Sequence, residues 1–107
     1  MADINLMNQV MINLIKNAIE ALTGAKDRKI TLKAEQLFRT QIAITITDNG
    51  CGISEADLNN IFIPFFTTKE KGAGIGLFLS KQIILMHEGQ ISVNSEEGQG
   101  TTFRVEI

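Results

Sequence analysis

The sequence predicts a single domain of the α/β class, in which helices alternate with pairs of β-strands. Two observations support this prediction. Apolar residues recur at helical spacing in two segments, residues 5–22 and residues 74–87. Four shorter segments alternate apolar and polar residues, as strands with one buried face do, and these are residues 29–37, 41–47, 90–94 and 101–107.

The composition is typical of one soluble domain with a modest core. The 107 residues are 44% hydrophobic and carry a net charge of -2. This charge is too close to neutral to favour nucleic acid, and no apolar run is long enough to cross a bilayer. The single cysteine, Cys51, excludes an internal disulfide. We therefore expect a cytoplasmic domain without direct membrane contact, and a membrane anchor elsewhere in a full-length protein stays an open question.

The helix at residues 5–22 is expected to pack on a core through its apolar face. Asn17 falls at the border of that face, where an amide must find hydrogen-bond partners. Asn13 lies one turn earlier, so both side chains can point at one ligand. An amide bonded to nearby backbone is the alternative interpretation. A helix end near Gly24 is predicted, with this glycine as the C′ residue.

The strands at residues 29–37 and 41–47 predict an antiparallel hairpin, each with one face toward a core. Asp48 continues the core-facing row of isoleucines in the second strand. A carboxylate in such a row is costly unless something bonds to it. Residues 49–52 follow, and they form either a plain turn or the mouth of a pocket. In the second case Asp48 is an acceptor, and the glycines leave room for a flat ligand.

A glycine-rich stretch precedes the second long helix. Ser54 predicts the N-cap of a short helix, and the Phe-rich residues 62–66 then anchor a polar lid at residues 67–73. The long helix is expected to begin near Gly74. Glycines allow close approach, and a helix N-terminus offers free N–H groups and partial positive charge, so an anion site is predicted there, phosphate being the commonest anion. A plain turn is the alternative.

The end of the chain predicts a second hairpin, formed by residues 90–94 and 101–107. His87 precedes it at the expected C-terminus of the long helix, where a cation is favoured. We assign this histidine a structural role, because nothing near it in the sequence forms a triad or a metal set.

Five stretches in order resemble the ATP-binding catalytic domain of sensor histidine kinases, which shares a superfamily with type II topoisomerases, mismatch-repair ATPases and ATP-driven chaperones. The stretches are NLIKNAIEAL (13–22), DNGCGI (48–53), FIPFFTTK (62–69), GAGIGL (72–77) and GQGTTF (98–103). They span nearly the whole chain, and five in order are very specific. The resemblance implies an α/β (α+β) two-layer sandwich of the Bergerat ATP-binding type, with helices on one face of a mixed, mainly antiparallel sheet.

The resemblance also implies residue roles. Asn17 matches the family's Mg²⁺-binding Asn, and Asp48 matches the acceptor for the adenine amino group. Asn13 and Lys69 are the expected catalytic residues, Asn13 near the metal and phosphates and Lys69 on the γ-phosphate. The full set expected to bind ATP and Mg²⁺ is Asn13, Asn17, Asp48, Gly50, Gly52, Ile53, Phe62, Lys69, Lys71, Gly72, Gly74, Ile75, Gly76, Leu77, Thr101 and Thr102.

The implied function is that of a protein-histidine kinase module. It would bind Mg-ATP and donate the γ-phosphate to a histidine on a separate dimerisation domain, with a response regulator downstream. The chain contains no dimerisation or phosphoacceptor segment, so we do not expect it to autophosphorylate alone.

Two alternatives stay open, an ATP hydrolase of the same superfamily and a non-catalytic nucleotide-binding module. The hydrolases carry Glu at the position of Asn13, and an amide is a poor general base, which favours the kinase. Glu20 departs from the family pattern, because many members carry Lys or Arg there as a phosphate contact.

Overall fold

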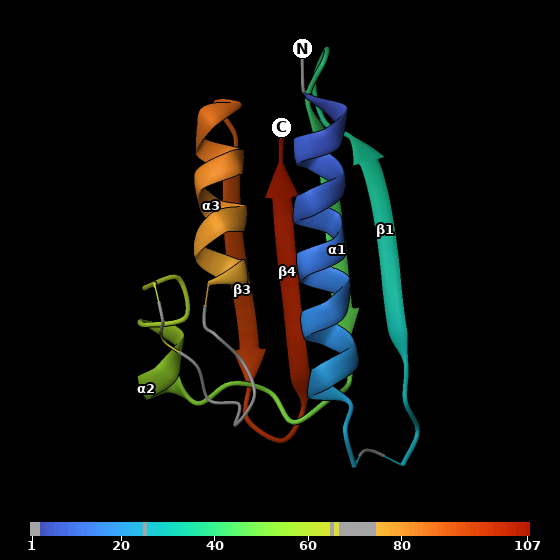
Figure 1. Cartoon of the computed structure of the whole chain (residues 1–107). Helices are drawn as coiled ribbons and strands as arrows, with labels where there is room; N and C mark the ends of the chain where they lie inside the picture. Colours follow the sequence, from blue (N-terminus) through green and yellow to red (C-terminus); the bar gives the residue numbers. More distant parts are fainter. Residues whose placement is uncertain (1–2, 25, 65, 67–74) are drawn as a thin grey trace.

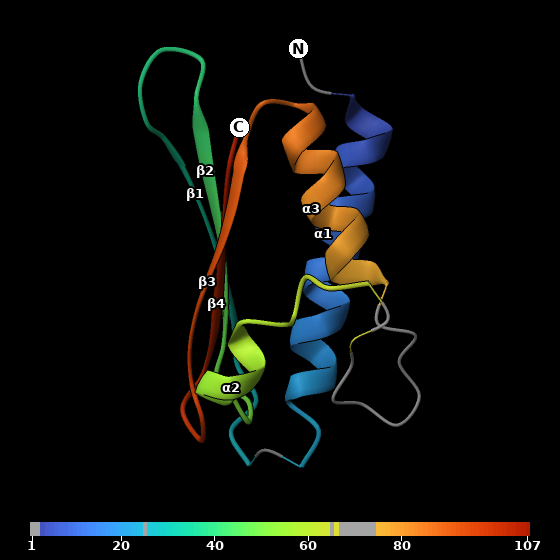
Figure 2. The same cartoon turned by 90° about the vertical axis from the view of Figure 1, so that its left-hand side faces the viewer.

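The computed structural model describes residues 3–24, 26–64, 66 and 75–107, which form two layers. The helices are α1 (Ile4–Ala21), α2 (Glu55–Leu58) and α3 (Gly76–Met86), and the strands are β1 (Ile30–Gln36), β2 (Ile42–Asp48), β3 (Gln90–Glu96) and β4 (Gly100–Glu106). Helices α1 and α3 lie side by side over the sheet (Figure 1), and the edge-on view shows helices in one layer and strands in the other (Figure 2). The predicted sandwich with its helices on one face is confirmed.

The sheet has the strand order β1-β2-β4-β3, and all three pairings of these strands are antiparallel. Both predicted hairpins are confirmed, while the described strands contain no parallel pair of the kind that a mixed sheet requires. The register places Asp48 at the end of β2 opposite Ile30 on one side and Thr101 on the other. One end of the sheet therefore gathers the motif that ends β2 and the motif that begins β4.

The core lies between the helices and the facing side of the sheet. Helix α1 contributes one buried residue per turn because its apolar residues recur every three or four positions. Full burial of each large apolar side chain stabilises the fold by about 1.5–3 kcal/mol. The buried cluster comprises Val10, Leu14, Ala18, Ile46, Ile61, Ile83, Ile84, Phe103 and Val105.

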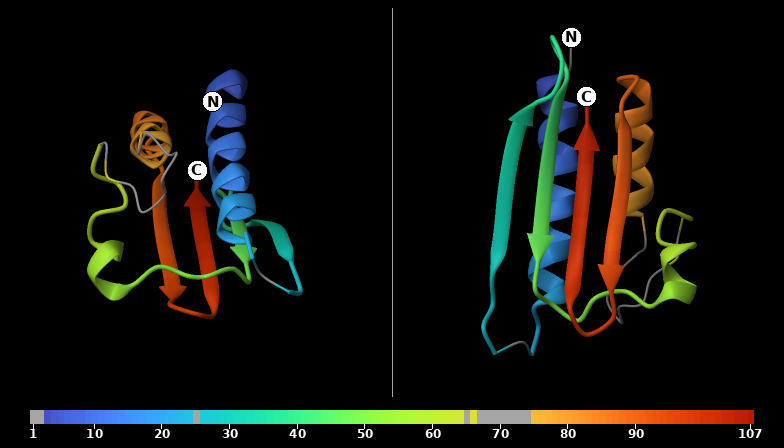
Figure 3. Two further views of the ribbon diagram at one scale, coloured as in Figure 1. Left: turned by 60° about the horizontal axis from the view of Figure 1, so that its bottom comes forward. Right: turned by 180° about the vertical axis from the view of Figure 1, so that it is seen from behind.

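The opposite face of the sheet is polar, and no described helix covers it when the molecule is seen from behind (Figure 3). Arg104 of β4 forms ion pairs there with Glu35 of β1 at 3.5 Å and with Glu106 at 3.3 Å. The sheet thus has one apolar and one solvated face, as alternating strands require.

The prediction that one face of β1 is buried is wrong for most of that strand. Only its first residue, Ile30, is half-buried, and Leu32 on the helix-facing side is 53% exposed. The reason is lateral position: β1 is an edge strand, and α1 lies over β2 and β4 instead. On α1 itself, Ile12 and Ile19 are 56% and 57% exposed.

The starts of α1 and α2 have side-chain caps, whereas two other helix ends differ from the prediction. Asp3 caps α1 by accepting hydrogen bonds from the N–H groups of Asn5 and Leu6, and Ser54 caps α2 as expected. Helix α1 has Leu22 as its C-cap, so Gly24 comes one position later than the C′ site predicted for it, with a φ of 85°. Helix α3 begins at Gly76 rather than near Gly74.

His87 joins the end of α3 to the start of α1. Its Nδ1 lies 2.7 Å from the carbonyl oxygen of Ile83, which can only accept, so Nδ1 carries the proton. Its Nε2 then accepts the backbone N–H of Asp3 at 3.0 Å. The structural role predicted for His87 fits this geometry.

Candidate functional site

The two expected asparagines lie on α1 beside the start of α3. The Asn13 Nδ2 donates to the carbonyl oxygen of Gly76 at 3.3 Å and to the Ser80 Oγ at 3.2 Å, and its Oδ1 accepts from the Gln9 Nε2 at 3.1 Å. Asn17 is half-buried one turn further along α1. Asn13 thus borders the point where α3 begins, and the ligand that the two amides are expected to share stays a prediction.

The N-terminus of α3 has the chemistry of an anion site. Its N-cap, Ile75, makes no side-chain hydrogen bond, and the first turn contains no acidic residue. The first N–H groups of this 11-residue helix therefore have no side-chain cap among the described residues, and the helix dipole adds partial positive charge there. A phosphate group is the kind of ligand that such an end accepts.

A buried carboxylate lies at the end of β2. Asp48 is 4% exposed, and its Oδ1 accepts the backbone N–H of Gly50 at 2.9 Å. Thr101, opposite it on β4, is also buried, and its Oγ1 lies 2.8 Å from the Ser95 Oγ. A carboxylate, two hydroxyl groups and the helix-facing side of the sheet meet at this position, which suits recognition of a polar edge on a flat ligand.

Thr102 does not belong to this group, which corrects the expectation that it shares the site. Successive side chains of a strand point to opposite faces. Thr102 therefore lies on the solvated face, where its Oγ1 is 3.1 Å from the Thr47 Oγ1.

Two of the expected glycines have a structural reason of their own. A Cβ at Gly50 would collide with the carbonyl oxygen of Ala21 in α1, and one at Gly52 would collide with the carbonyl oxygen of Glu96 in β3. Gly52 has a φ of 74° as well. Both glycines are therefore required by backbone packing around the turn that follows Asp48, and the space they were predicted to leave for a ligand stays a prediction.

Three other expected contact residues are half-buried around these groups, namely Ile53, Ile75 and Leu77. Phe62 packs edge-on against Phe103 with ring centroids 6.5 Å apart, and the Lys81 Nζ lies 5.1 Å from its centroid. The prediction that the Phe-rich segment anchors itself to the core is confirmed for this residue. Lys69, Lys71, Gly72, Gly74 and the proposed lid lie outside the described residues.

Sequence reasoning missed three polar residues that hold the site together. Ser95 accepts the N–H of Ile53 at 2.8 Å and donates to the carbonyl oxygen of Gly100 at 2.8 Å, which ties the Asp48 turn to the second hairpin. Asn49 accepts the N–H of Lys29 at 2.8 Å and also bonds the carbonyl oxygen of Asp27. The third is Ser80. It lies three positions before buried Ile83 and therefore on the same face of the helix, which could have indicated its burial.

The described residues contain no group of three His, Cys, Asp or Glu side chains placed to hold a metal. Mg²⁺ does not need such a group, because it keeps several waters and is held through one or two protein oxygens together with phosphates. An amide oxygen beside an anion-binding helix end fits that ligand set. None of the described helices is long and apolar enough to cross a membrane.

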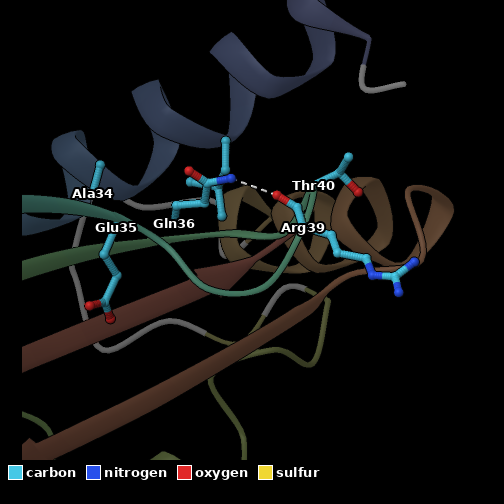
Figure 4. Close-up of a pocket in the computed structure, with 6 residues that line it drawn as sticks. Ala34, Glu35, Gln36, Arg39 and Thr40 are labelled. Carbon is cyan, nitrogen blue, oxygen red and sulfur yellow. Dashed lines mark hydrogen bonds between the residues drawn. The ribbon is translucent and has the colours of Figure 1, made fainter.

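A separate hollow lies at the turn between β1 and β2, at the opposite end of these strands from Asp48 (Figure 4). Within it the Gln36 Nε2 donates to the Arg39 carbonyl oxygen at 2.6 Å. The hollow is lined by Ala34, Glu35, Gln36, Arg39, Thr40 and Ile42. It shares no residue with the site described above.

The family model and the individual proteins that this chain resembles agree with one another. Residues 2–107 match the family model described as "Histidine kinase-, DNA gyrase B-, and HSP90-like ATPase". The chain is 43% identical over 103 residues to sporulation kinase E of Bacillus subtilis (strain 168), and 46% identical over 102 residues to the signal transduction histidine-protein kinase AtoS of Escherichia coli (strain K12). These matches cover 96% and 95% of this chain but only 14% and 16% of the two relatives.

Solved structures agree in fold. The catalytic domain of histidine kinase ThkA has a TM-score of 0.84 and 37% identity, with 99% of this chain and 68% of that one covered. Full-length ShkA in complex with AMPPNP has a TM-score of 0.83 and 26% identity, with 94% and 21% covered.

Proposed function

The chain belongs to the family of histidine kinase-, DNA gyrase B- and HSP90-like ATPases, and from that premise we propose that it is the Mg-ATP-binding catalytic module of a sensor histidine kinase. It would donate the γ-phosphate of ATP to a histidine on a separate dimerisation domain, from which a response regulator would receive it. The observation that carries the proposal is the buried Asp48 carboxylate at one end of the sheet, with the uncapped start of α3 and two amides beside it.

The Asp48 end is proposed to bind adenine. One carboxylate oxygen already accepts the Gly50 N–H, so the remaining acceptor capacity can take the adenine 6-amino group. Guanine carries a carbonyl at that position and would place oxygen against oxygen. Thr101, on the same face and opposite Asp48, can contact the same edge of the base.

The α3 end is proposed to bind the phosphates. The first N–H groups of α3 would donate hydrogen bonds to phosphate oxygens, and the Asn17 amide oxygen would hold Mg²⁺. When bound, Mg²⁺ neutralises phosphate charge. Lys69, and Lys71 after it, remain the proposed cations for the γ-phosphate. ShkA, a relative in fold, was solved in complex with AMPPNP, an ATP analogue, which supports the proposal that this chain binds a nucleotide.

The reaction would be a transfer in which the protein mainly positions the reactants. The bond between the γ-phosphorus and the bridging oxygen breaks, ADP leaves, and a bond forms to a ring nitrogen of the acceptor histidine, whose N–H proton is released. His87 cannot be that acceptor. Both its nitrogens are engaged, and at about 1.5 Å per residue it lies about 16 Å from the start of the 11-residue α3.

Hydrolysis is the less favoured candidate. A hydrolase needs a general base for water, and Asn13 stands where the hydrolases of the superfamily carry Glu. With radiolabelled ATP, the isolated chain should neither retain label nor release phosphate quickly. Rapid release without a partner would favour the hydrolase, and acid-labile label on the chain would point to His87.

The test of the binding proposal compares ATP and GTP by calorimetry in the presence of Mg²⁺. We expect ATP to bind at least about tenfold more tightly, because a site built on a buried hydrogen bond strongly rejects the base that lacks it. Asp48→Asn keeps an oxygen for Gly50 but replaces the other oxygen with a donor. It should weaken ATP binding about tenfold or more while the midpoint of urea unfolding changes little.

Glu35→Gln is the matched control, because it makes the same chemical change in an exposed carboxylate on the other face of the sheet. ATP affinity should be unchanged in that variant. Equal affinities for ATP and GTP in the unsubstituted chain would contradict the assignment of Asp48.

A further inference from the structure

Ser80 is a buried polar residue in an apolar environment. It lies on α3 one turn after Gly76, its exposed fraction is 0%, and it is enclosed with core residues such as Ile83 and Ile84. Alanine would fill this position in a helix without burying a hydroxyl group and has the higher helix propensity. The buried hydroxyl of Ser80 therefore needs a hydrogen-bond partner, and in the structure this partner is the Asn13 side chain.

The contacts of Asn13 determine how its carboxamide is oriented. The Gly76 carbonyl oxygen can only accept, so the amide group that faces α3 must be the Nδ2. This nitrogen has two hydrogens, and two acceptors face it: the Gly76 oxygen at 3.3 Å and the Ser80 Oγ at 3.2 Å. With both hydrogens taken, the Oδ1 is directed away from α3, where the exposed Gln9 Nε2 is its partner.

We infer that Ser80 is a positioning residue, whose hydroxyl holds the Asn13 carboxamide in one fixed orientation beside the start of α3, where the phosphates are proposed to bind. The inference rests on the proposed function of the site and adds a residue to it. Without the Ser80 acceptor, one Nδ2 hydrogen loses its partner, and the amide is free to rotate away from α3. The carboxamide is then correctly placed for only part of the time, and Mg-nucleotide affinity falls through Asn13 alone.

The central experiment is a double-mutant cycle. The affinity for AMPPNP with Mg²⁺ is measured by calorimetry for the unsubstituted chain, Ser80→Ala, Asn13→Ala and the double variant. One hydrogen bond typically accounts for about a threefold to tenfold change, so we expect Ser80→Ala to lose that much affinity. On the Asn13→Ala background, the same substitution should change nothing further. Ser92→Ala, an exposed serine on the solvated face of β3, is the matched control and should bind as the unsubstituted chain does.

A second measurement needs no nucleotide, and its first part needs no substitution. In the ¹⁵N-labelled chain, the side-chain N–H protons of Asn13 should exchange with water more slowly than those of Asn8, which is exposed on the same helix. In Ser80→Ala the Asn13 signals should shift, and their exchange should approach that of Asn8. Asn13 exchange as fast as Asn8 exchange in the unsubstituted chain overturns the inference even if Ser80→Ala does not fold.

The remaining outcomes separate this inference from the proposed function. Unchanged affinity in Ser80→Ala, or an equal loss in the presence and absence of Asn13, overturns the positioning role and leaves nucleotide binding intact. Unchanged affinity would mean that the Ser80 hydroxyl plays no part in binding. An equal loss with and without Asn13 would mean that Ser80 acts through packing. Failure of the unsubstituted chain to bind AMPPNP with Mg²⁺ overturns the proposed function, and the positioning role with it.

Discussion

Thr101 and Thr102 are adjacent residues of the same type that lie on opposite faces of one strand. Thr101 is buried on the helix-facing side opposite Asp48, whereas Thr102 pairs with Thr47 on the solvated side. The motif that contains both cannot distinguish them, but the alternation of a strand does. A shift of one residue along the strand thus decides whether a threonine faces the helices or the solvent.

These two threonines provide a matched pair of substitutions. Thr101→Val removes the hydroxyl that meets Ser95 and faces the proposed adenine site, and we expect about a threefold to tenfold loss of ATP affinity. Thr102→Val makes the same change on the far side of the sheet and should leave affinity unchanged. Calorimetry of both variants checks this, and equal losses would show that the hydroxyl groups act through strand stability rather than through contact.

The glycine in the Asp48 turn gives a prediction about stability. Gly50→Ala puts a methyl group into the Ala21 carbonyl, and because backbone cannot yield as a side chain does, the free energy of unfolding should fall by about 1–3 kcal/mol or more. Gly76→Ala is the comparison, since the nearest atom to its Cβ is 3.8 Å away, in Asn13. It should raise the unfolding free energy by about 0.4–1 kcal/mol. Urea unfolding measures both, and a stable Gly50→Ala chain would contradict the packing described here.

At the scale of the elements, α1 and α3 contact each other in two places. His87, at the end of α3, bonds the start of α1, and Asn13, in the middle of α1, bonds the start of α3. The His87 ring makes two hydrogen bonds, one within α3 and one to the backbone N–H that precedes α1. This contact bridges residues 84 positions apart in the chain. It fixes how the two helices lie relative to each other, and hence where Asn13 meets α3.

His87→Phe keeps a ring but loses both nitrogens. At about 0.5–1.5 kcal/mol for each hydrogen bond, we expect the unfolding free energy to fall by about 1–3 kcal/mol. For a domain of this size, each kcal/mol lowers the Tm by about 4–8 °C. Leu85→Ala, a half-exposed neighbour on α3, is the control and should have a smaller effect. Calorimetric melting curves check the prediction, and an unchanged Tm in His87→Phe would show that the contact is not formed in solution.

The sequence predicts the elements well because each depends on a local pattern. Periodicity places α1, α3 and both hairpins, and capping chemistry places the start of α2. It fails for the burial of β1, because whether Leu32 is covered depends on where α1 lies across the sheet. It also places the start of α3 two residues too early, because the glycines there obscure the boundary.

The residues of the candidate site also fall into two groups, those that a local pattern indicates and those whose partners are distant in the chain. Asn17 and Asp48 can be picked out because each is a polar residue at the edge of an apolar pattern, and Asn13 because it lies one turn before Asn17. Ser80 and Ser95 were missed because their partners, Asn13 and Ile53, are 67 and 42 positions away in the chain. The packing reason for Gly50 and Gly52 was missed because the atoms they must avoid, in Ala21 and Glu96, belong to backbone distant in the chain.

At the scale of the whole molecule, the chain exposes apolar surface along one side. Ile12 and Ile19 on α1 and Leu32 on β1 are each more than half exposed, and β1 is an edge strand with open hydrogen-bonding groups. Edge strands and apolar side chains of this kind promote association between chains. We therefore expect the 107-residue chain to self-associate as its concentration rises.

Leu32→Lys tests this expectation, because an edge lysine opposes strand pairing and places charge on the apolar surface. The average mass from sedimentation should stay that of a monomer over a wider concentration range, with little change in the free energy of unfolding. Met86→Lys adds the same charge to α3, away from β1, and should leave association as it was. An unsubstituted chain that remains monomeric at high concentration would contradict the expectation.

The position of β4 has a consequence for how the protein is made. This strand is the last of the four in the chain, yet it lies inside the sheet between β2 and β3. During synthesis at about 5–20 residues per second, β2 and β3 have no common neighbour until residues 100–106 leave the ribosome. Until then Asp48 has no Thr101 opposite it, and the core lacks the side chain of Phe103. The nascent chain therefore cannot assemble the proposed nucleotide site gradually, and the sheet and this site are completed together when β4 is added.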